Sequence, residues 1–201
     1  QDAPVDWVLV ELRQAGAPAT IVARQAALLT RDGDIVNAAT GSTNLTFTSV
    51  TEGNYFVSVR HRNHLGVMTA AVVALSKTST LVDFTLSTTA TYGSHSRLLS
   101  GTKAFLWAGD VNHDQRAIVN GPGNDVSDIL GNVLSTPTNT LFNTNYALQG
   151  YLFSDVDMNG ITLFAGPQNE VNMLMGNVLL HPLNTTFSAN YIIRGGLSQL
   201  P

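Results

Sequence analysis

The chain has 201 residues, of which 44% are hydrophobic and only 12% carry a charge. This length suffices for one large or two small domains with a sizeable core. The net charge is −4 and the chain has no basic run, which argues against nucleic acid as a partner. No apolar run reaches the roughly 18–20 residues of a membrane span, so membrane insertion is not expected.

The polar part of the chain consists mainly of Asn, Thr and Ser, which is common on the surface of secreted β-rich proteins. Cysteine is absent, so a secreted form needs a source of stability other than disulfides, and bound metal is one such source. The first residue is Gln1 rather than Met, which suggests a piece processed from a longer precursor. We therefore expect a secreted, extracellular protein of the cell surface.

Residues 1–88 have the pattern of an all-β domain. Side chains alternate along residues 5–10 with the periodicity of a strand. The run Ile21–Thr30 also has the composition of a short helix, but its neighbours favour a strand. About seven short strands separated by polar turns predict a sandwich of immunoglobulin or transthyretin type. After residues 5–10, the further expected strands are Thr20–Leu29, Asn44–Thr48, Tyr55–His61, Val67–Leu75 and Leu81–Leu86.

Residues 89–103 are polar and contain glycine, as is typical of a linker, and residues 104–201 carry an ungapped internal repeat. Asp110–Gly150 aligns with Asp155–Gly195 at an offset of 45 positions. A gapless match of this length indicates one supersecondary unit built twice. We therefore expect a second domain made of two units, at 104–150 and 151–201.

Each unit is expected to contain one short amphipathic helix. In the first, apolar residues at helical spacing follow Asn124-Asp125 and stop before Pro137. In the second, the same pattern follows Asn169-Glu170 and stops before Pro182. We expect the two apolar stripes to pack together with pseudo-twofold symmetry.

Each copy opens with acidic and amide side chains at alternate positions. Calcium takes about six to eight oxygen ligands, and an EF-hand loop supplies side-chain oxygens from positions 1, 3 and 5, a carbonyl from 7 and a carboxylate from 12. Positions 1, 3, 5 and 7 are Asp110, Asn112, Asp114 and Arg116 in the first copy, and Asp155, Asp157, Asn159 and Ile161 in the second. The pattern predicts two calcium sites.

The closing carboxylate departs from this scheme. Position 12 is Gly121 or Gly166, and the first acid comes four residues later, at Asp125 or Glu170. We interpret each loop as lengthened by four residues, with a Gly-Pro turn absorbing the extra chain. An acid at the first helical residue also interacts favourably with the helix dipole.

The two expected sites differ at position 6, where the sharp turn requires a positive φ. Gly160 adopts this conformation freely, whereas Gln115 in the first copy does so at a cost. The second site is therefore expected to be geometrically cleaner. The competing interpretation is that both Asp/Asn clusters are plain turns, and two copies in register, each followed by an acid-led helix, favour calcium.

The two repeat blocks, AGDVNHDQ…GPGNDVSDIL and SDVDMNG…GPQNEVNMLM, resemble a dockerin-type tandem of calcium-binding loop–helix repeats. Together with VDWVLVELR (5–13), VARQAALLTRDGDIV (22–36) and GNYFVSVRHRNHLGVMTA (53–70), they make the whole chain similar to a C-terminal module of large secreted and surface proteins of bacteria. The resemblance implies an extracellular, non-catalytic region with two calcium sites. Gln115, Glu170 and Met173 depart from its pattern.

The expected fold class is therefore mixed: an immunoglobulin- or transthyretin-like sandwich followed by a dockerin-like pair of calcium loop–helix repeats. The densest polar cluster outside the loops is Arg60–His64, which we interpret as a strand end with structural hydrogen bonds rather than a metal or anion site. His61 and His64 would point to opposite faces of a strand.

The expected function is that of a non-catalytic structural or assembly module stabilised by two calcium ions. The chain has no G-x-S-x-G elbow and no phosphate-binding glycine loop, so no enzyme activity is expected. The alternatives are a protein-recognition module of dockerin type or an adhesin domain, and a self-assembling filament subunit. They imply a protein partner or self-association.

Overall fold

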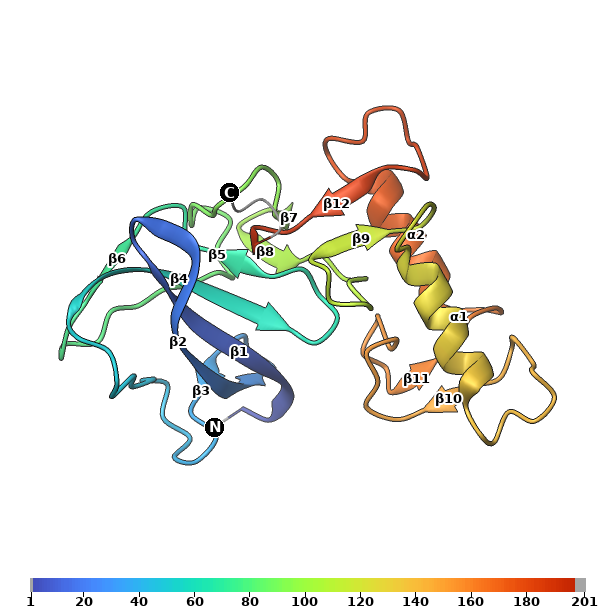
Figure 1. The fold of residues 1–201 in the computed structure, drawn as a ribbon, viewed down its shortest axis with the longest axis horizontal. Coiled ribbons are helices and arrows are strands. Elements are labelled where there is room, and N and C mark those ends of the chain that lie inside the picture. The colour runs from blue at the N-terminus through green and yellow to red at the C-terminus, as the bar shows by residue number, and fades with distance from the viewer. Residues whose placement is uncertain (1, 198–201) are drawn as a thin grey trace.

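The computed structural model describes residues 2–197, which form a β-rich chain with two helices (Figure 1). Neither helix is long and apolar enough to cross a membrane. The strands are β1 (Pro4–Gln14), β2 (Ala17–Thr30), β3 (Ile35–Val36), β4 (Gly53–His61), β5 (Val67–Met68), β6 (Val73–Leu75), β7 (Arg97–Ser100), β8 (Lys103–Leu106), β9 (Arg116–Ile118), β10 (Leu148–Gln149), β11 (Ile161–Thr162) and β12 (Ile192–Arg194), and the helices are α1 (Asp125–Ser135) and α2 (Glu170–Leu180).

The first half is organised around one antiparallel sheet in the order β3-β2-β1-β4-β5, with β6 also paired to β4. The long hairpin of β1 and β2 follows from alternating apolar residues on both sides of the Ala15-Gly16 turn. Val8, Val10 and Leu12 of β1 are buried in the apolar core on one face of the sheet. The predicted strands at residues 5–10, 20–29 and 55–61 are therefore confirmed, with longer bounds.

The expected β-sandwich is wrong, because a second sheet does not form within residues 2–88. Asn44–Thr48 and Leu81–Leu86 are irregular segments that pack Phe47 and Phe84 onto the apolar face of the sheet. Backbone amides in these segments bond nearby side chains: Asp83 Oδ1, for example, accepts a hydrogen bond of 2.8 Å from the Thr85 amide. Short polar side chains that bond the nearby backbone compete with strand pairing, and apolar content alone does not reveal this competition.

Two further departures concern segments near the expected domain boundary. Residues 67–75 give β5 and β6, two short strands that both pair with β4, instead of one strand. The hairpin of β7 and β8 begins inside residues 89–103, the segment expected to be a linker. This segment is thus partly built into a ladder.

In the second half, both helices begin where the sequence predicts. Asn124 and Asn169 are the N-caps, and their side-chain oxygens accept hydrogen bonds from the amides of Ser127 and Asn172, each 2.8 Å long. An Asn at this position satisfies one of the amides that a helix start leaves without an intrahelical partner. Both helices end before the prolines, as expected.

The two repeat copies are joined by ladders that each take one strand from either copy. β9 of the first copy pairs with β12 of the second, and β10 of the first pairs with β11 of the second. The registers are equivalent, since Ile193 faces Ala117 as Leu148 faces Thr162. The arrangement has the pseudo-twofold relation that the repeat predicts.

The expected dockerin-like pair of helical calcium repeats is nevertheless wrong. Among residues 104–197, α1 and α2 are the only α-helices and have 11 residues each, and most of the rest consists of strands, turns and irregular segments. Both helices pack on β9 as well as on each other. Their core also contains Leu65 and Trp107, which lie outside the aligned copies. The short helices therefore complete a β-rich core instead of forming a helical module.

Main-chain hydrogen bonds join the sheet to the repeats. The Leu65 amide donates to the Trp107 carbonyl at 2.8 Å, and the Gly109 amide donates to the Asn63 carbonyl at 2.9 Å. Figure 1 shows the six-stranded sheet on the left, both helices on the right, and β9 and β12 between them. The segment just after β4 therefore lies at the centre of the molecule, beside the start of the first loop.

Candidate metal site

The two predicted loops have the same local hydrogen-bond pattern. The side chain at position 3 accepts from the amide of position 5, and the side chain at position 5 accepts from the amide of position 7, at distances of 2.8–3.1 Å. These are Asx turns, so the plain-turn interpretation explains the local loop shape. The residues involved are Asn112, Asp114 and Arg116 in the first copy, and Asp157, Asn159 and Ile161 in the second.

The acid at the start of each helix reaches back to the start of its own loop. Asp125 Oδ1 accepts from the Val111 amide at 2.7 Å, and Glu170 Oε2 accepts from the Val156 amide at 2.8 Å. Both carboxylates are buried. The lengthened loop therefore closes on the helix in both copies, through a contact that the turn interpretation does not predict.

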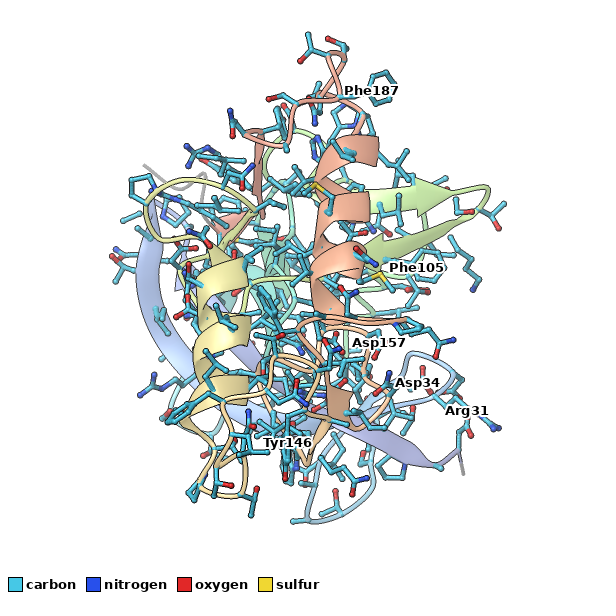
Figure 2. All side chains as sticks on the ribbon, turned by 90° about the vertical axis from the view of Figure 1, so that its right-hand side faces the viewer. Arg31, Asp34, Phe105, Tyr146, Asp157 and Phe187 are labelled. Atoms are coloured by element: carbon cyan, nitrogen blue, oxygen red, sulfur yellow. The ribbon has the colours of Figure 1, made fainter. Side chains whose placement is uncertain are left out.

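In the second copy, three carboxylates converge. Asp155, Asp157 and Glu170 each offer one oxygen, and these oxygens lie within 4.8 Å of one another. Figure 2 shows Asp157 beside α2, the helix that Glu170 begins. Glu170 is 1% exposed, and its Oε1 has no hydrogen-bond partner among residues 2–197. A buried carboxylate oxygen without a partner is costly, and a cation between these groups would satisfy it.

In the first copy, the closing acid is already satisfied by the main chain. Asp125 Oδ2 accepts from the Ile118 amide at 2.8 Å, and Oδ1 accepts from Val111. Asp125 is one methylene shorter than Glu170, so its carboxylate stays against the backbone. Among the described residues, no cluster of three His, Cys, Asp or Glu side chains forms in this loop.

Gln115 occupies the turn of the first loop and bonds its first acid. Its φ is +65°, against +86° for Gly160 in the second copy, which confirms the positive φ expected at position 6. Its Nε2 donates to Asp110 Oδ2 at 2.9 Å, while its Oε1 accepts from the Gly66 amide at 3.0 Å. The side-chain amide thus donates to a carboxylate that would otherwise face a cation.

Burial raises the pKa of the inner carboxyl groups in both loops. The pKa of Asp110 is raised to about 7 by burial and by the charge of Asp125. Burial likewise raises the pKa of Asp125 to about 7, and burial together with Asp157 raises that of Glu170 to about 7. Burial therefore favours the neutral form of these carboxyl groups, and a bound cation would favour their charged form.

The structure places the remaining predicted residues at the edges of the loops. Arg116 and Ile161, expected to offer main-chain carbonyls, are the first residues of β9 and β11. Asn112 directs its Nδ2 to the Gly123 carbonyl at 3.0 Å. Asn159 Nδ2 donates to Asp157 Oδ2 at 2.9 Å, so these two residues of the second loop are in contact.

Sequence reasoning missed two residues that support the second loop from outside. Arg62 Nη2 lies 3.4 Å from Asp155 Oδ2, and Asn63 Nδ2 donates to the Asp155 carbonyl. The run of polar residues at Arg60–His64 is a visible signal in the sequence. It does not identify the partner of Arg62, because Asp155 lies 93 positions away. In the same cluster, His61 Nε2 lies 3.1 Å from Asp6 Oδ2, and the rings of His61 and His64 are in edge contact.

Comparison of the chain with protein-family models, with curated proteins and with solved structures found no match.

Proposed function

We propose that this chain is a non-catalytic extracellular module with a structural or assembly role in a surface protein, and that calcium in the second loop stabilises its fold. The first loop is proposed as a second, weaker site. The fold would then be locked in calcium-rich surroundings and loosened elsewhere, in a chain that has no cysteine.

One observation carries the proposal: the convergence of Asp155, Asp157 and Glu170 around a buried carboxylate oxygen that has no partner. The side chains offered are carboxylates, with the Asn159 amide nearby, and no nitrogen or sulfur ligand is among them. Oxygen-only donors suit hard cations, and several carboxylates in one loop suit the adaptable coordination geometry of calcium better than the strict octahedron of magnesium.

The test is thermal unfolding in excess calcium and in excess chelator, on protein whose bound metal is quantified. At a calcium concentration about 100 times Kd, one site adds roughly 2.7 kcal/mol to the free energy of unfolding. For a chain of this length we expect a rise in Tm of about 5–10 °C. An unchanged Tm together with the absence of bound metal would refute the proposal.

Matched variants assign the effect to one loop. Asp157→Asn keeps the oxygen that accepts from the Asn159 amide but removes a charge from the cluster. In the first loop, Asp114→Asn likewise removes a charge and keeps the oxygen that accepts from the Arg116 amide. We expect the first variant to lose most of the calcium-dependent rise in Tm and the second to keep most of it.

Self-association is a second candidate, favoured by apolar side chains at two repeat-related loops. Phe142 and Phe187 are 71% and 67% exposed, and both have a φ near +50°. Figure 2 shows Phe187 at the tip of the loop after α2. Sedimentation at high protein concentration in millimolar calcium tests this role, since Phe142→Ser with Phe187→Ser should then convert an oligomer to a monomer. A monomeric wild type would exclude it.

A further inference from the structure

Arg62 follows β4 directly, and its guanidinium is buried between the sheet and the second loop. The side chain is 8% exposed. Nε lies 2.9 Å from Asp6 Oδ2, Nη1 donates to the Leu152 carbonyl, and Nη2 lies 3.4 Å from Asp155 Oδ2. The guanidinium carbon also lies 4.4 Å from the centre of the Tyr151 ring. A single side chain thus contacts β1 and the start of the second loop.

Asp155 is fixed on one side by these contacts. Its Oδ2 accepts from the Gly160 amide at 3.1 Å in addition to facing Arg62, and its main-chain carbonyl accepts from Asn63. From the described part of the chain, its Oδ1 accepts only one bond, of 3.0 Å, from the Asn159 amide. The first residue of the loop is therefore oriented by Arg62 and Asn63, which lie outside the repeat, together with amides of its own loop, and Oδ1 is the less occupied oxygen.

Asp6 anchors the arginine from the other side. It is a strand residue of β1 whose side chain is 1% exposed, and its Oδ1 accepts from the Tyr151 hydroxyl. Arg60, two residues before Arg62, has no such role. Its side chain is 33% exposed, and its nearest carboxylate oxygen in an ion pair is Glu11 Oε1, at 3.9 Å.

We infer that Arg62 is a positioning residue for the second calcium loop. The linked contacts Asp6–Arg62–Asp155 couple calcium binding in that loop to the stability of the six-stranded sheet. The inference rests on the proposed function. Groups that orient the ligands of a metal commonly contribute roughly 10- to 100-fold to its affinity. Because a coupling free energy is reciprocal, the contacts of Arg62 with the sheet strengthen calcium binding by the same free energy by which bound calcium stabilises those contacts.

The charge and the geometry of Arg62 act in opposite directions. A positive charge beside the site weakens calcium binding, whereas an oriented Asp155 strengthens it. Arg62→Lys separates the two effects, because the charge stays but one ammonium group cannot span the acceptors on both sides. Arg60→Lys is the matched control, on the same strand end but without a contact to Asp155.

The experiment is calorimetric titration of calcium into the metal-free wild type and both variants. We expect Arg62→Lys to raise the calcium Kd about tenfold or more, and Arg60→Lys to leave it within about twofold. An unchanged or lower Kd in Arg62→Lys would overturn the inference while the proposed function stood. A wild type that does not bind calcium would instead remove the proposed function.

Hydrogen exchange on the wild type tests the coupling without any variant. Calcium should slow exchange of the amides in residues 5–9 and 60–65, as well as those in the loop itself. Residues 73–75 of β6, which pairs with the opposite end of β4, serve as the internal reference. Protection confined to the loop and α2 would contradict the coupling.

Discussion

A single methylene group distinguishes the two closing acids. Both Asp125 and Glu170 begin a helix and bond the second amide of their loop. The shorter Asp125 places both oxygens on main-chain amides, whereas the longer Glu170 leaves Oε1 free among carboxylates. The sequence shows this difference, but which of the two residues keeps a free oxygen depends on where the backbone amides point.

At the same scale, the His61–His64 pair predicts how stability depends on pH. Burial, together with the charges of His61 and Arg62, lowers the pKa of His64 to about 3 from an ordinary 6.5, with Asp6 opposing. Burial also lowers the pKa of His61. A histidine with a lowered folded-state pKa favours the neutral form, so its contribution to stability is complete above about pH 6.5 and is lost as the pH falls toward about 3.

The measurement is urea unfolding of the wild type and His64→Gln between pH 7 and pH 4. We expect the free energy of unfolding of the wild type to fall more steeply, by up to about 1.4 kcal/mol per pH unit. The exposed His95, changed to Gln, is the control and should follow the wild type. Equal slopes for all three proteins would show that His64 does not titrate as its surroundings imply.

At the scale of elements, each helix is followed by a loop built on one buried asparagine. Asn139 and Asn184 are each 3% exposed and occupy equivalent positions in the two copies. Asn184 Nδ2 donates to the carbonyls of Val178 and Ser188, at 2.7 and 2.9 Å, and its Oδ1 accepts from the Ser188 amide. Asn139 makes the same three bonds. These amides satisfy carbonyls at the helix ends, which lack intrahelical partners.

We therefore predict that Asn184→Ala lowers the free energy of unfolding by roughly 1–3 kcal/mol, because buried backbone groups lose their partners. Asn139→Ala should cost a similar amount. The exposed Asn190 lies in the same loop as Asn184, and Asn190→Ala should change stability by less than about 0.5 kcal/mol. Urea denaturation measures all three, and a similar cost for Asn184→Ala and Asn190→Ala would contradict the assigned role.

Elements defined by local pattern could be predicted, and those defined by distant partners could not. The helices follow from an asparagine cap and apolar spacing within about a dozen residues, and β1, β2 and β4 follow from alternation. The pairing of β9 with β12 joins residues about 75 positions apart, and the contact of Arg62 with Asp155 spans 93. Similarly, Asn44–Thr48 has strand composition but no ladder partner within residues 2–197. Local sequence patterns do not contain this information.

At the scale of the whole molecule, the two tryptophans report on different halves. Trp7 lies on β1 and is 48% exposed, whereas Trp107 is 2% exposed in the core beneath the helices. Leu65 belongs to that second core although it follows β4 of the sheet. Because side chains and backbone bonds cross between the halves, we predict one cooperative unfolding transition in calcium.

Fluorescence of two single-tryptophan variants tests this prediction. Trp107→Phe leaves Trp7 as the reporter of the sheet, and Trp7→Phe leaves Trp107 as the reporter of the repeat core. We expect coincident urea midpoints in calcium, and midpoints that separate in chelator if the second loop loosens first. Midpoints that differ in calcium would show that the halves unfold independently, as two domains joined by a linker would do.

The two ladders between the repeat copies make each copy depend on the other for strand pairing. Each ladder draws β9 or β10 from the first copy and β12 or β11 from the second. A single copy would leave two short strands without partners and would expose half of the core. It could satisfy both only by pairing with a second copy of itself. We therefore expect a single copy, produced alone, to form a homodimer through the same two ladders.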